Sequence, residues 1–344
     1  MSKVFALALG CGTQNRDEEW LEVYYPAPVL SPDTALVDAV RETLDYEGGN
    51  VALSLSHRQV GQLARAWREA GHEEQASYAV AFQESDQPLV ITVLETDAAP
   101  SSTPEAYLKL HLLSHRLVRP HAVNLSGIFP LLPNVAWTSD GAVDLDELPE
   151  KQLLARLDGR LLSVFSVDKF PRMTDYVVPS GVRIADTARV RLGAYVGEGT
   201  TIMHEGFINF NAGTEGPGMI EGRISAGVFV GRGSDIGGGA STMGTLSGGG
   251  NIIISLGEDC LLGANAGTGI PLGDRCTIES GLYITAGTKV NLLDEKGEQV
   301  RTAKARELAG QSDLLFRRNS LTGAVECLTN KSAVALNEEL HKHN

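Results

Sequence analysis

The 344-residue sequence is poor in cysteine, in long hydrophobic runs and in positive charge, and each shortage excludes a class of protein. Its four cysteines lie far apart with no Cys-x-x-Cys pair, which argues against a zinc cluster or a disulfide scaffold and predicts a reducing, cytoplasmic location. The longest apolar runs, such as residues 4–9, are too short to span a membrane or to act as a signal peptide. With 43 acidic against 29 basic residues, the net charge of −14 argues against binding to nucleic acid or to an anionic membrane surface.

Glycine, by contrast, is concentrated in one segment: 27 of the 38 glycines lie between positions 181 and 297. Here an aliphatic or small residue recurs at every sixth position, in two runs whose phase shifts by four near residues 226–230. The first run is Val178, Ile184, Val190, Val196, Ile202, Ile208, Thr214, Ile220 and Ala226, and the second is Val230, Ile236, Thr242, Gly248, Ile254, Cys260, Ala266, Leu272, Ile278, Ile284 and Val290. This period fits neither a helix nor an alternating strand, and it predicts a solenoid in which each six residues form a short strand and a tight turn. A flexible glycine linker is disfavoured because it would keep no aliphatic residue in phase.

The residues before the repeat predict a different kind of domain. Strand-like runs at 4–9, 21–25, 89–94 and 161–167 are mixed with helical patterns at 57–70 and 103–118, so residues 1–175 are expected to form an α/β domain. This part of the sequence shows no catalytic motif. Its histidines His111, His115 and His121 are loosely spaced, which favours ordinary histidines over a metal site.

The residues after the repeat, 293–344, form a C-terminal segment that contains a basic stretch. Residues 300–318 hold five basic and two acidic residues in a chain that is acidic overall. On charge alone, this stretch could be a solvated surface segment or a site for the phosphates of a nucleotide-like cofactor.

Four stretches are richer in polar and reactive residues than the repeat requires. They are His204–Gly213 (HEGFINFNAG), Met219–Ser225 (MIEGRIS), Gly237–Ser241 (GGGAS) followed by Gly248–Gly250, and Lys304–Leu308 (KAREL) with Phe316–Ser320 (FRRNS) downstream. Together with the repeat, they resemble the longer form of the tetrahydrodipicolinate N-succinyltransferases, a family of hexapeptide-repeat acyltransferases. The resemblance covers roughly residues 176–344, and before that only 12–16 and 20–23 are similar.

The resemblance implies a fold, an assembly and a reaction. The fold is a left-handed parallel β-helix over residues 176–292, with an N-terminal α/β domain at 1–175 and a short C-terminal extension at 293–344. The assembly is a homotrimer with active sites between neighbouring subunits. The reaction transfers a succinyl group from succinyl-CoA to tetrahydrodipicolinate and gives N-succinyl-2-amino-6-oxopimelate and CoA, a step towards diaminopimelate and lysine.

Acyl transfer to nitrogen requires a group that removes a proton or carries the acyl group transiently, and a carboxylate in a partly dry cleft can do either. Taken alone, Glu221 of the MIEGR motif would be a surface turn residue, and the resemblance is what implies its catalytic role. Because Glu221 follows the aliphatic Ile220, its side chain is expected to point out of the coil. Gly222 is expected to leave room for a substrate. The sequence does not choose between a covalent acyl-enzyme and direct attack.

The resemblance also implies a CoA site and a metal site. The residues expected to contact succinyl-CoA are Arg223, Gly238, Ser241, Ala264, Glu279, Ser280, Gly287, Lys304, Arg317, Arg318, Asn319 and Ser320. For the small residues among them, packing within the solenoid is the alternative explanation. Glu205 of the HEG motif is expected to bind Mg²⁺ at the trimer axis, since three carboxylates there would repel one another without a cation. Asp186 is a weaker second candidate for the metal.

Three other functions compete with this one. A hexapeptide-repeat acyltransferase with a different acceptor would use His204, the one histidine between residues 178 and 292. A carbonic anhydrase of the γ class needs several zinc-binding histidines on the solenoid, so the same count excludes it. A non-catalytic scaffold would require neither the basic stretch nor the MIEGR sequence.

Overall fold

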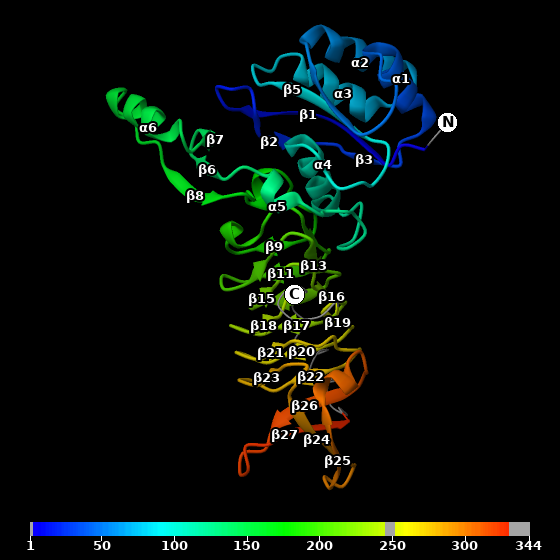
Figure 1. The fold of residues 1–344 in the computed structure, drawn as a ribbon, viewed down its shortest axis with the longest axis vertical. Helices are drawn as coiled ribbons and strands as arrows, with labels where there is room; N and C mark the ends of the chain where they lie inside the picture. Colours follow the sequence, from blue (N-terminus) through cyan, green and yellow to red (C-terminus); the bar gives the residue numbers. More distant parts are fainter. Residues whose placement is uncertain (1–2, 245–251, 330–344) are drawn as a thin grey trace. The chain divides into compact units, whose positions relative to one another are not determined.

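The computed structural model describes residues 3–244 and 252–329, so the expected glycine run Gly248–Gly250 lies outside the described residues. The chain divides into two compact units, and Figure 1 labels many of their elements. Unit 1 consists of Met1–Val118, Ala122–Pro171 and Asp175–Val177, and unit 2 of Arg119–His121, Arg172–Thr174 and Val178–Asn344. Within the described residues, no helix is both long and apolar enough to cross a lipid bilayer.

An antiparallel sheet forms the core of unit 1, with strand order β2-β1-β5-β4 and with β3 paired to β1. The strands are β1 (Ala6–Gln14), β2 (Trp20–Tyr24), β3 (Val29–Leu30), β4 (Val51–Leu55) and β5 (Leu89–Leu94), and the helices are α1 (Thr34–Leu44), α2 (His57–Glu69), α3 (Glu73–Phe82) and α4 (Thr103–Ser114). Helices α1 to α3 pack with the sheet in one hydrophobic cluster that includes Leu7, Leu63 and Trp67. Helix α4 is buried along almost its whole length and contacts β2 and β5.

The expected elements of unit 1 form, with shifted boundaries. Helix α2 begins after Ser56, whose hydroxyl accepts the Gln59 N–H. Helix α4 is capped by Ser102, whose hydroxyl accepts the Glu105 N–H, and it ends at Ser114 rather than near 118. The early end follows from Arg116, whose positive φ of 62° is incompatible with a continuing right-handed helix.

A smaller three-stranded sheet and a helix form the arm, residues 132–172. The arm contains β6 (Val135–Thr138), β7 (Gly141–Asp144), α6 (Leu148–Leu157) and β8 (Val164–Asp168), and the short α5 (Ile128–Leu131) precedes it. Residues 12–16 (GTQNR) bind the arm through two hydrogen bonds. Asn15 Nδ2 donates to Asp144 at 2.9 Å, and the Arg16 N–H donates to Glu147 at 2.7 Å. Several large apolar side chains of the arm are more than half exposed: Leu153, Leu154, Leu157, Leu161, Phe165 and Val167.

Unit 2 is built from three ladders of short parallel strands (Figure 1). The first ladder contains β9 (Arg183–Ile184), β11 (Thr200–Ile202), β14 (Gly218–Ile220), β17 (Asp235–Ile236), β20 (Leu261–Leu262) and β22 (Thr277–Ile278); the second contains β12 (Phe207–Ile208), β15 (Arg223–Ile224), β18 (Ser241–Thr242), β21 (Gly267–Thr268) and β23 (Tyr283–Ile284); the third contains β10 (Ala194–Val196), β13 (Ala212–Thr214), β16 (Phe229–Val230) and β19 (Ser255–Leu256). Short 3₁₀ turns lie at Met173–Asp175, Thr187–Arg189 and Ala305–Leu308. The chain visits the ladders in turn, so each circuit adds one coil.

The inward residues of the ladders make a continuous core. They are almost completely buried: Ile202, Ile208, Thr214, Ile220, Ile224, Val230, Ile236, Thr242, Leu256, Leu262, Thr268, Leu272, Ile278 and Ile284. The six-residue period is therefore confirmed. The expected phase is wrong at Ile254, Cys260 and Ala266, which are buried but lie two positions before the residues that face the core within the paired strands.

The phase shift also lies elsewhere than expected. The strands show that one step of four residues separates Ile220 from Ile224, and not the residues near 226–230, and that a second separates Thr268 from Leu272. Val178, the first expected inward residue, is 72% exposed because it precedes β9 and pairs with no ladder strand. A shortened corner, the turn between two ladders, leaves the ladders in register because the strands on either side of it still pair with those of the adjoining layers.

The C-terminal segment closes the first ladder with four longer strands. They are β24 (Lys289–Leu293), β25 (Gln299–Lys304), β26 (Leu314–Arg318) and β27 (Val325–Thr329), in the order β25-β24-β27-β26, with β26 paired to β22. One face of these strands buries Val290, Ala303, Phe316 and Cys327. The alternate residues therefore occupy the outer face.

Replacing Leu262→Ala should lower the free energy of unfolding by about 2–5 kcal/mol, because it leaves a cavity in the buried column. Leu321→Ala is the matched control, since Leu321 is 95% exposed and its truncation should cost less than about 0.5 kcal/mol. Chemical denaturation of both variants measures the difference. Equal stabilities would show that the column does not carry the fold of unit 2.

Candidate functional site

One corner of unit 2, between the first and second ladders, carries many of the predicted site residues, stacked one layer above the next. From layer to layer it presents Glu205, Glu221, Gly238, Ala264, Glu279 with Ser280, and then Arg317 with Arg318. Backbone hydrogen bonds fix this order: the Glu221 N–H donates to Ile236 at 2.8 Å, and the Glu279 N–H donates to Phe316 at 2.9 Å. Neighbouring strands lie about 4.8 Å apart, so the four layers from Glu221 to Arg317 span about 19 Å.

The corner that holds Glu221 is shorter than its neighbours. Three residues, 221–223, separate the inward Ile220 from Ile224, whereas five residues stand at the same place in the layers before and after, 203–207 and 237–241. Gly222 packs closely against the next layer, because a Cβ on it would lie 2.4 Å from the carbonyl oxygen of Ala240, and Gly206 makes the same kind of close approach in the five-residue corner of the layer before. The expectation that Gly222 leaves room for a substrate is therefore wrong: its missing side chain is needed for packing against the next layer.

The carboxylate of Glu221 lies over the next layer. A Cβ built on Gly238 would have a Glu221 carboxylate oxygen at 3.4 Å as its near neighbour. The flanking glycines have other reasons to be glycine: a Cβ on Gly237 would lie 2.7 Å from the Leu262 carbonyl oxygen, and Gly239 has a φ of +70°. Gly238 has neither constraint, so its bare Cα leaves space beside a half-buried acid.

Arg223 and Ser241 lie beside this corner on the outer face of the second ladder. They are paired residues of β15 and β18, and their neighbours Ile224 and Thr242 point into the core. Arg223 is exposed, whereas Ser241 is only 8% exposed. The guanidinium group and the hydroxyl thus belong to adjacent layers of one surface.

The outer face of the C-terminal sheet gathers a second group of the predicted residues. Lys304 of β25 pairs with Lys289 of β24, and the register places Arg317 on the same face. Glu326, which the sequence did not single out, fixes two of the expected CoA residues: Arg317 Nε donates to it at 3.0 Å, and Asn319 Nδ2 at 2.7 Å. The Asn319 hydrogen bond, followed by that of Arg317, lowers the pKa of the Glu326 carboxyl.

A cleft of about 720 Å³ opens beside this face. It is lined by Lys289, Asn291, Thr302, Ala303, Lys304, Glu307, Ala324 and Val325. Of these, the sequence predicted only Lys304 as a site residue. The others were missed because strand pairing, and not sequence spacing, brings β24, β25 and β27 together.

Other predicted residues lie apart from these two groups or have local roles. Gly287 and Ser320 are exposed turn residues. Glu279 accepts the Arg318 N–H at 2.6 Å and so joins the last coil to β26. The Asp186 side chain accepts the Ala188 N–H at 3.0 Å.

No group of three metal-ligating side chains occurs within the described part of a single chain. Glu205 is exposed, and its backbone carbonyl accepts a hydrogen bond from Arg189 at 2.9 Å. A site made of one carboxylate from each of three chains is not a cluster within one chain, so the metal site stays a prediction. The buried His111 ring engages both nitrogens, with the Tyr25 N–H and the Tyr107 carbonyl oxygen, and burial lowers its pKa to about 3.

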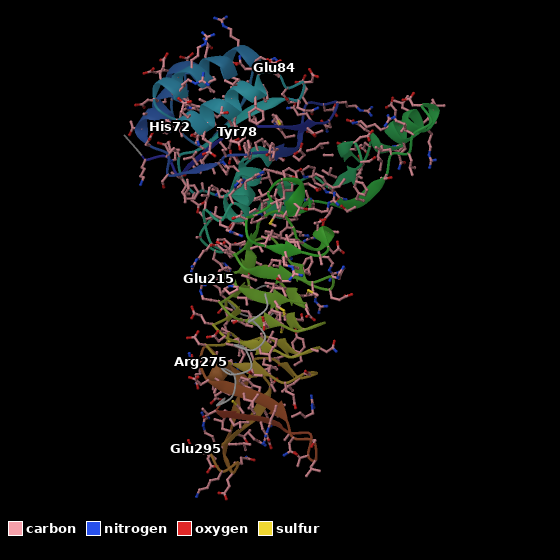
Figure 2. All side chains as sticks on the ribbon, turned by 180° about the vertical axis from the view of Figure 1, so that it is seen from behind. His72, Tyr78, Glu84, Glu215, Arg275 and Glu295 are labelled. Carbon is pink, nitrogen blue, oxygen red and sulfur yellow. The ribbon has the colours of Figure 1, made fainter. Side chains whose placement is uncertain are left out.

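In unit 2 a second set of contacts holds residues 119–121 to the solenoid. Glu215, labelled in Figure 2, pairs with Arg119, whose guanidinium group also lies 5.6 Å from the centre of the Phe229 ring. The His121 ring contacts the Gly227 carbonyl oxygen at 2.7 Å. These contacts assign His121 a structural position, as expected for an ordinary histidine.

Two family models match the chain. Residues 132–172, which form the arm, match the middle region of tetrahydrodipicolinate N-succinyltransferase, and residues 253–286 match the hexapeptide repeat of succinyl-transferases. The arm match is notable because the sequence offered no motif there.

Curated relatives match over nearly the whole chain. Proteins named 2,3,4,5-tetrahydropyridine-2,6-dicarboxylate N-succinyltransferase from Pseudomonas putida and Vibrio cholerae are 72% and 63% identical, each over 99% of both chains. A crystal structure of a putative 2,3,4,5-tetrahydropyridine-2-carboxylate N-succinyltransferase from Campylobacter jejuni is similar with a TM-score of 0.88 and 32% identity, covering 97% of this chain and 94% of that one.

Two alanine substitutions distinguish a packing glycine from a site glycine. Gly222→Ala should lower the free energy of unfolding by about 1–3 kcal/mol, because its Cβ meets the backbone of the next layer. Gly238→Ala should leave the melting temperature almost unchanged, because its Cβ meets only the Glu221 carboxylate. Thermal unfolding of both variants tests this, and a larger loss in Gly238→Ala would show that Gly238 is required for packing.

Proposed function

The chain belongs to the tetrahydrodipicolinate N-succinyltransferase family, and we propose that Glu221 is its catalytic carboxylate. The family's enzymes are CoA-dependent acyltransferases that move a succinyl group from succinyl-CoA to 2,3,4,5-tetrahydropyridine-2,6-dicarboxylate. The observation that carries the proposal is the half-buried carboxylate at the shortened corner, beside the bare Cα of Gly238. Partial burial and free space on one side are what a reacting carboxylate requires.

Two chemical roles fit this carboxylate. As a nucleophile, a Glu221 oxygen would attack the thioester carbon; the carbon–sulfur bond would break, CoA would leave as a thiolate, and a mixed anhydride would remain for the acceptor nitrogen to attack. As a base, Glu221 would take the proton that the acceptor nitrogen, or the water that opens the cyclic imine, gives up during the reaction. Arg223 on the adjoining face would bind the succinyl carboxylate by paired hydrogen bonds.

The donor would lie along the corner, from Glu221 towards the C-terminal sheet. The intervening layers present the small residues Gly238, Ala264 and Ser280, which leave space along the surface between the carboxylate and Arg317, about four layers or 19 Å away. Lys304, Arg317, Arg318, Asn319 and Ser320 would bind the phosphates and adenosine of CoA. Glu279 would hold the Arg318 backbone in place and so act indirectly.

The fold and assembly follow as further proposals. The match to the hexapeptide repeat of succinyl-transferases supports a left-handed winding of the three ladders. The exposed apolar side chains of the arm support an oligomer, because a soluble monomer seldom leaves so many large apolar groups in water. A homotrimer with Mg²⁺ held by three copies of Glu205 would complete the assembly, and the location would be cytoplasmic.

Replacing Glu221→Gln should lower kcat by roughly 10²–10⁴-fold, because the amide neither accepts the proton nor forms the anhydride, while CoA should still bind. The matched control is Glu258→Gln, which removes an exposed carboxylate at another corner. Wild-type enzyme is incubated with succinyl-CoA alone, denatured, freed of unreacted succinyl-CoA and then treated with hydroxylamine. Succinyl hydroxamate released from the protein supports the anhydride. Near-wild-type turnover of Glu221→Gln would remove both roles.

Sedimentation equilibrium should give about three times the chain mass of 36.7 kDa.

Elemental analysis of the purified trimer should find about one Mg²⁺ or Ca²⁺ per three chains, since hard carboxylate oxygens suit these ions. Glu205→Gln should abolish the metal and weaken the trimer, whereas Asp186→Asn should retain both. Loss of the metal in Asp186→Asn alone would assign the metal site to Asp186 in place of Glu205. A monomer with full activity would show that the active sites are not shared between subunits.

A further inference from the structure

Two lysines face each other on the C-terminal sheet. Lys289 of β24 and Lys304 of β25 are paired residues of antiparallel strands, and both are exposed. Like charges placed directly opposite each other destabilise a strand pair. Among the described residues, neither ammonium group has an ion-pair partner. The pair is therefore a cost to the unliganded fold that a bound anion would remove.

The same lysines line the 720 Å³ cleft, together with one acidic residue, Glu307. That acid is already engaged: it accepts the Lys304 N–H at 2.9 Å and forms an ion pair with Arg301 at 3.3 Å. The backbone hydrogen bond, followed by Arg301, lowers the pKa of the Glu307 carboxyl. Because Arg301 and Lys304 share this one acid and Lys289 has no ion-pair partner among the described residues, the cleft carries an excess of positive charge in a chain whose net charge is −14.

The backbone beside Lys289 is also open. Gly287, in the turn before β24, has no heavy atom within 4 Å of the place where a Cβ would stand. On the outer face next to the lysines, the Thr302 hydroxyl donates to the Asn291 side-chain oxygen at 2.8 Å. This hydrogen bond orients both polar groups beside the lysines. A ligand of some size can approach the two ammonium groups without displacing protein.

We propose that Lys289 acts with Lys304 as a two-lysine site for the phosphate monoester of the acyl donor. The proposal rests on the proposed function, since the donor there is succinyl-CoA. Two adjacent ammonium groups match a single dianionic group better than a carboxylate or a phosphodiester, each of which carries one charge. The succinyl end of the donor must reach Glu221 in the β14 layer, so the C-terminal sheet meets the opposite end, which carries the 3′-phosphate monoester.

The test compares the binding of CoA and of 3′-dephospho-CoA by calorimetry. Lys289→Ala should raise the Kd for CoA by about tenfold, which corresponds to about 1.4 kcal/mol, and should leave the Kd for dephospho-CoA nearly unchanged. Lys304→Ala should behave alike, and Lys289→Arg should restore most of the affinity. Lys296→Ala is the matched control, because it removes the same charge from the turn of the same hairpin and should change neither Kd.

The unliganded protein gives an independent readout. Lys289→Ala should melt at the same temperature as the wild type or higher, because it removes the repulsion with Lys304. An equal loss of affinity for CoA and dephospho-CoA would overturn the assignment to the monoester, and an unchanged Kd for CoA would overturn the site. If wild-type protein binds dephospho-CoA but turns over no succinyl-CoA, the proposed function is wrong. The comparison of Kd values among the lysine variants then still tests whether Lys289 and Lys304 bind the phosphate monoester.

Discussion

The parallel hydrogen-bond register between successive coils is the constraint on which the rest of unit 2 depends. Each strand has two or three residues, too few to be stable alone, so every layer is held by the layers on either side and by the buried aliphatic column. Register fixes which residues become neighbours. It places Glu221 over Gly238 although they are 17 positions apart, and it pairs Arg223 with Ser241.

Corner length varies while the ladders stay in register, because the strands on either side of each corner remain paired. The corner at Glu221 is two residues shorter than those of the adjoining layers, and the ladders continue through it undisturbed. Gly222 in this corner packs its bare Cα against the next layer. The solenoid therefore supplies a rigid frame, and a local change at one corner places a carboxylate without cost to the core.

Electrostatics separates the two ends of the site. The chain is strongly acidic, but the outer face of the C-terminal sheet presents Lys289 and Lys304. The acids near them are already engaged by hydrogen bonds, Glu307 with Arg301 and Glu326 with Arg317 and Asn319. The electrostatic potential at this outer face is therefore positive. A donor that extends from Glu221 would end at the same face.

The sequence by itself determined the six-residue period, the α/β character of the first 175 residues and the family that the motifs resemble. It could do so because the spacing of buried aliphatic residues and the types of reactive residues can be read from short stretches of the chain. It misplaced the phase shift and missed Lys289, Glu307 and Glu326. These errors have one cause: which corner is short, and which strands of the C-terminal sheet adjoin, depend on hydrogen bonds between segments far apart in the chain. Only the tertiary structure decides such pairings, since no local pattern records the neighbour across a strand.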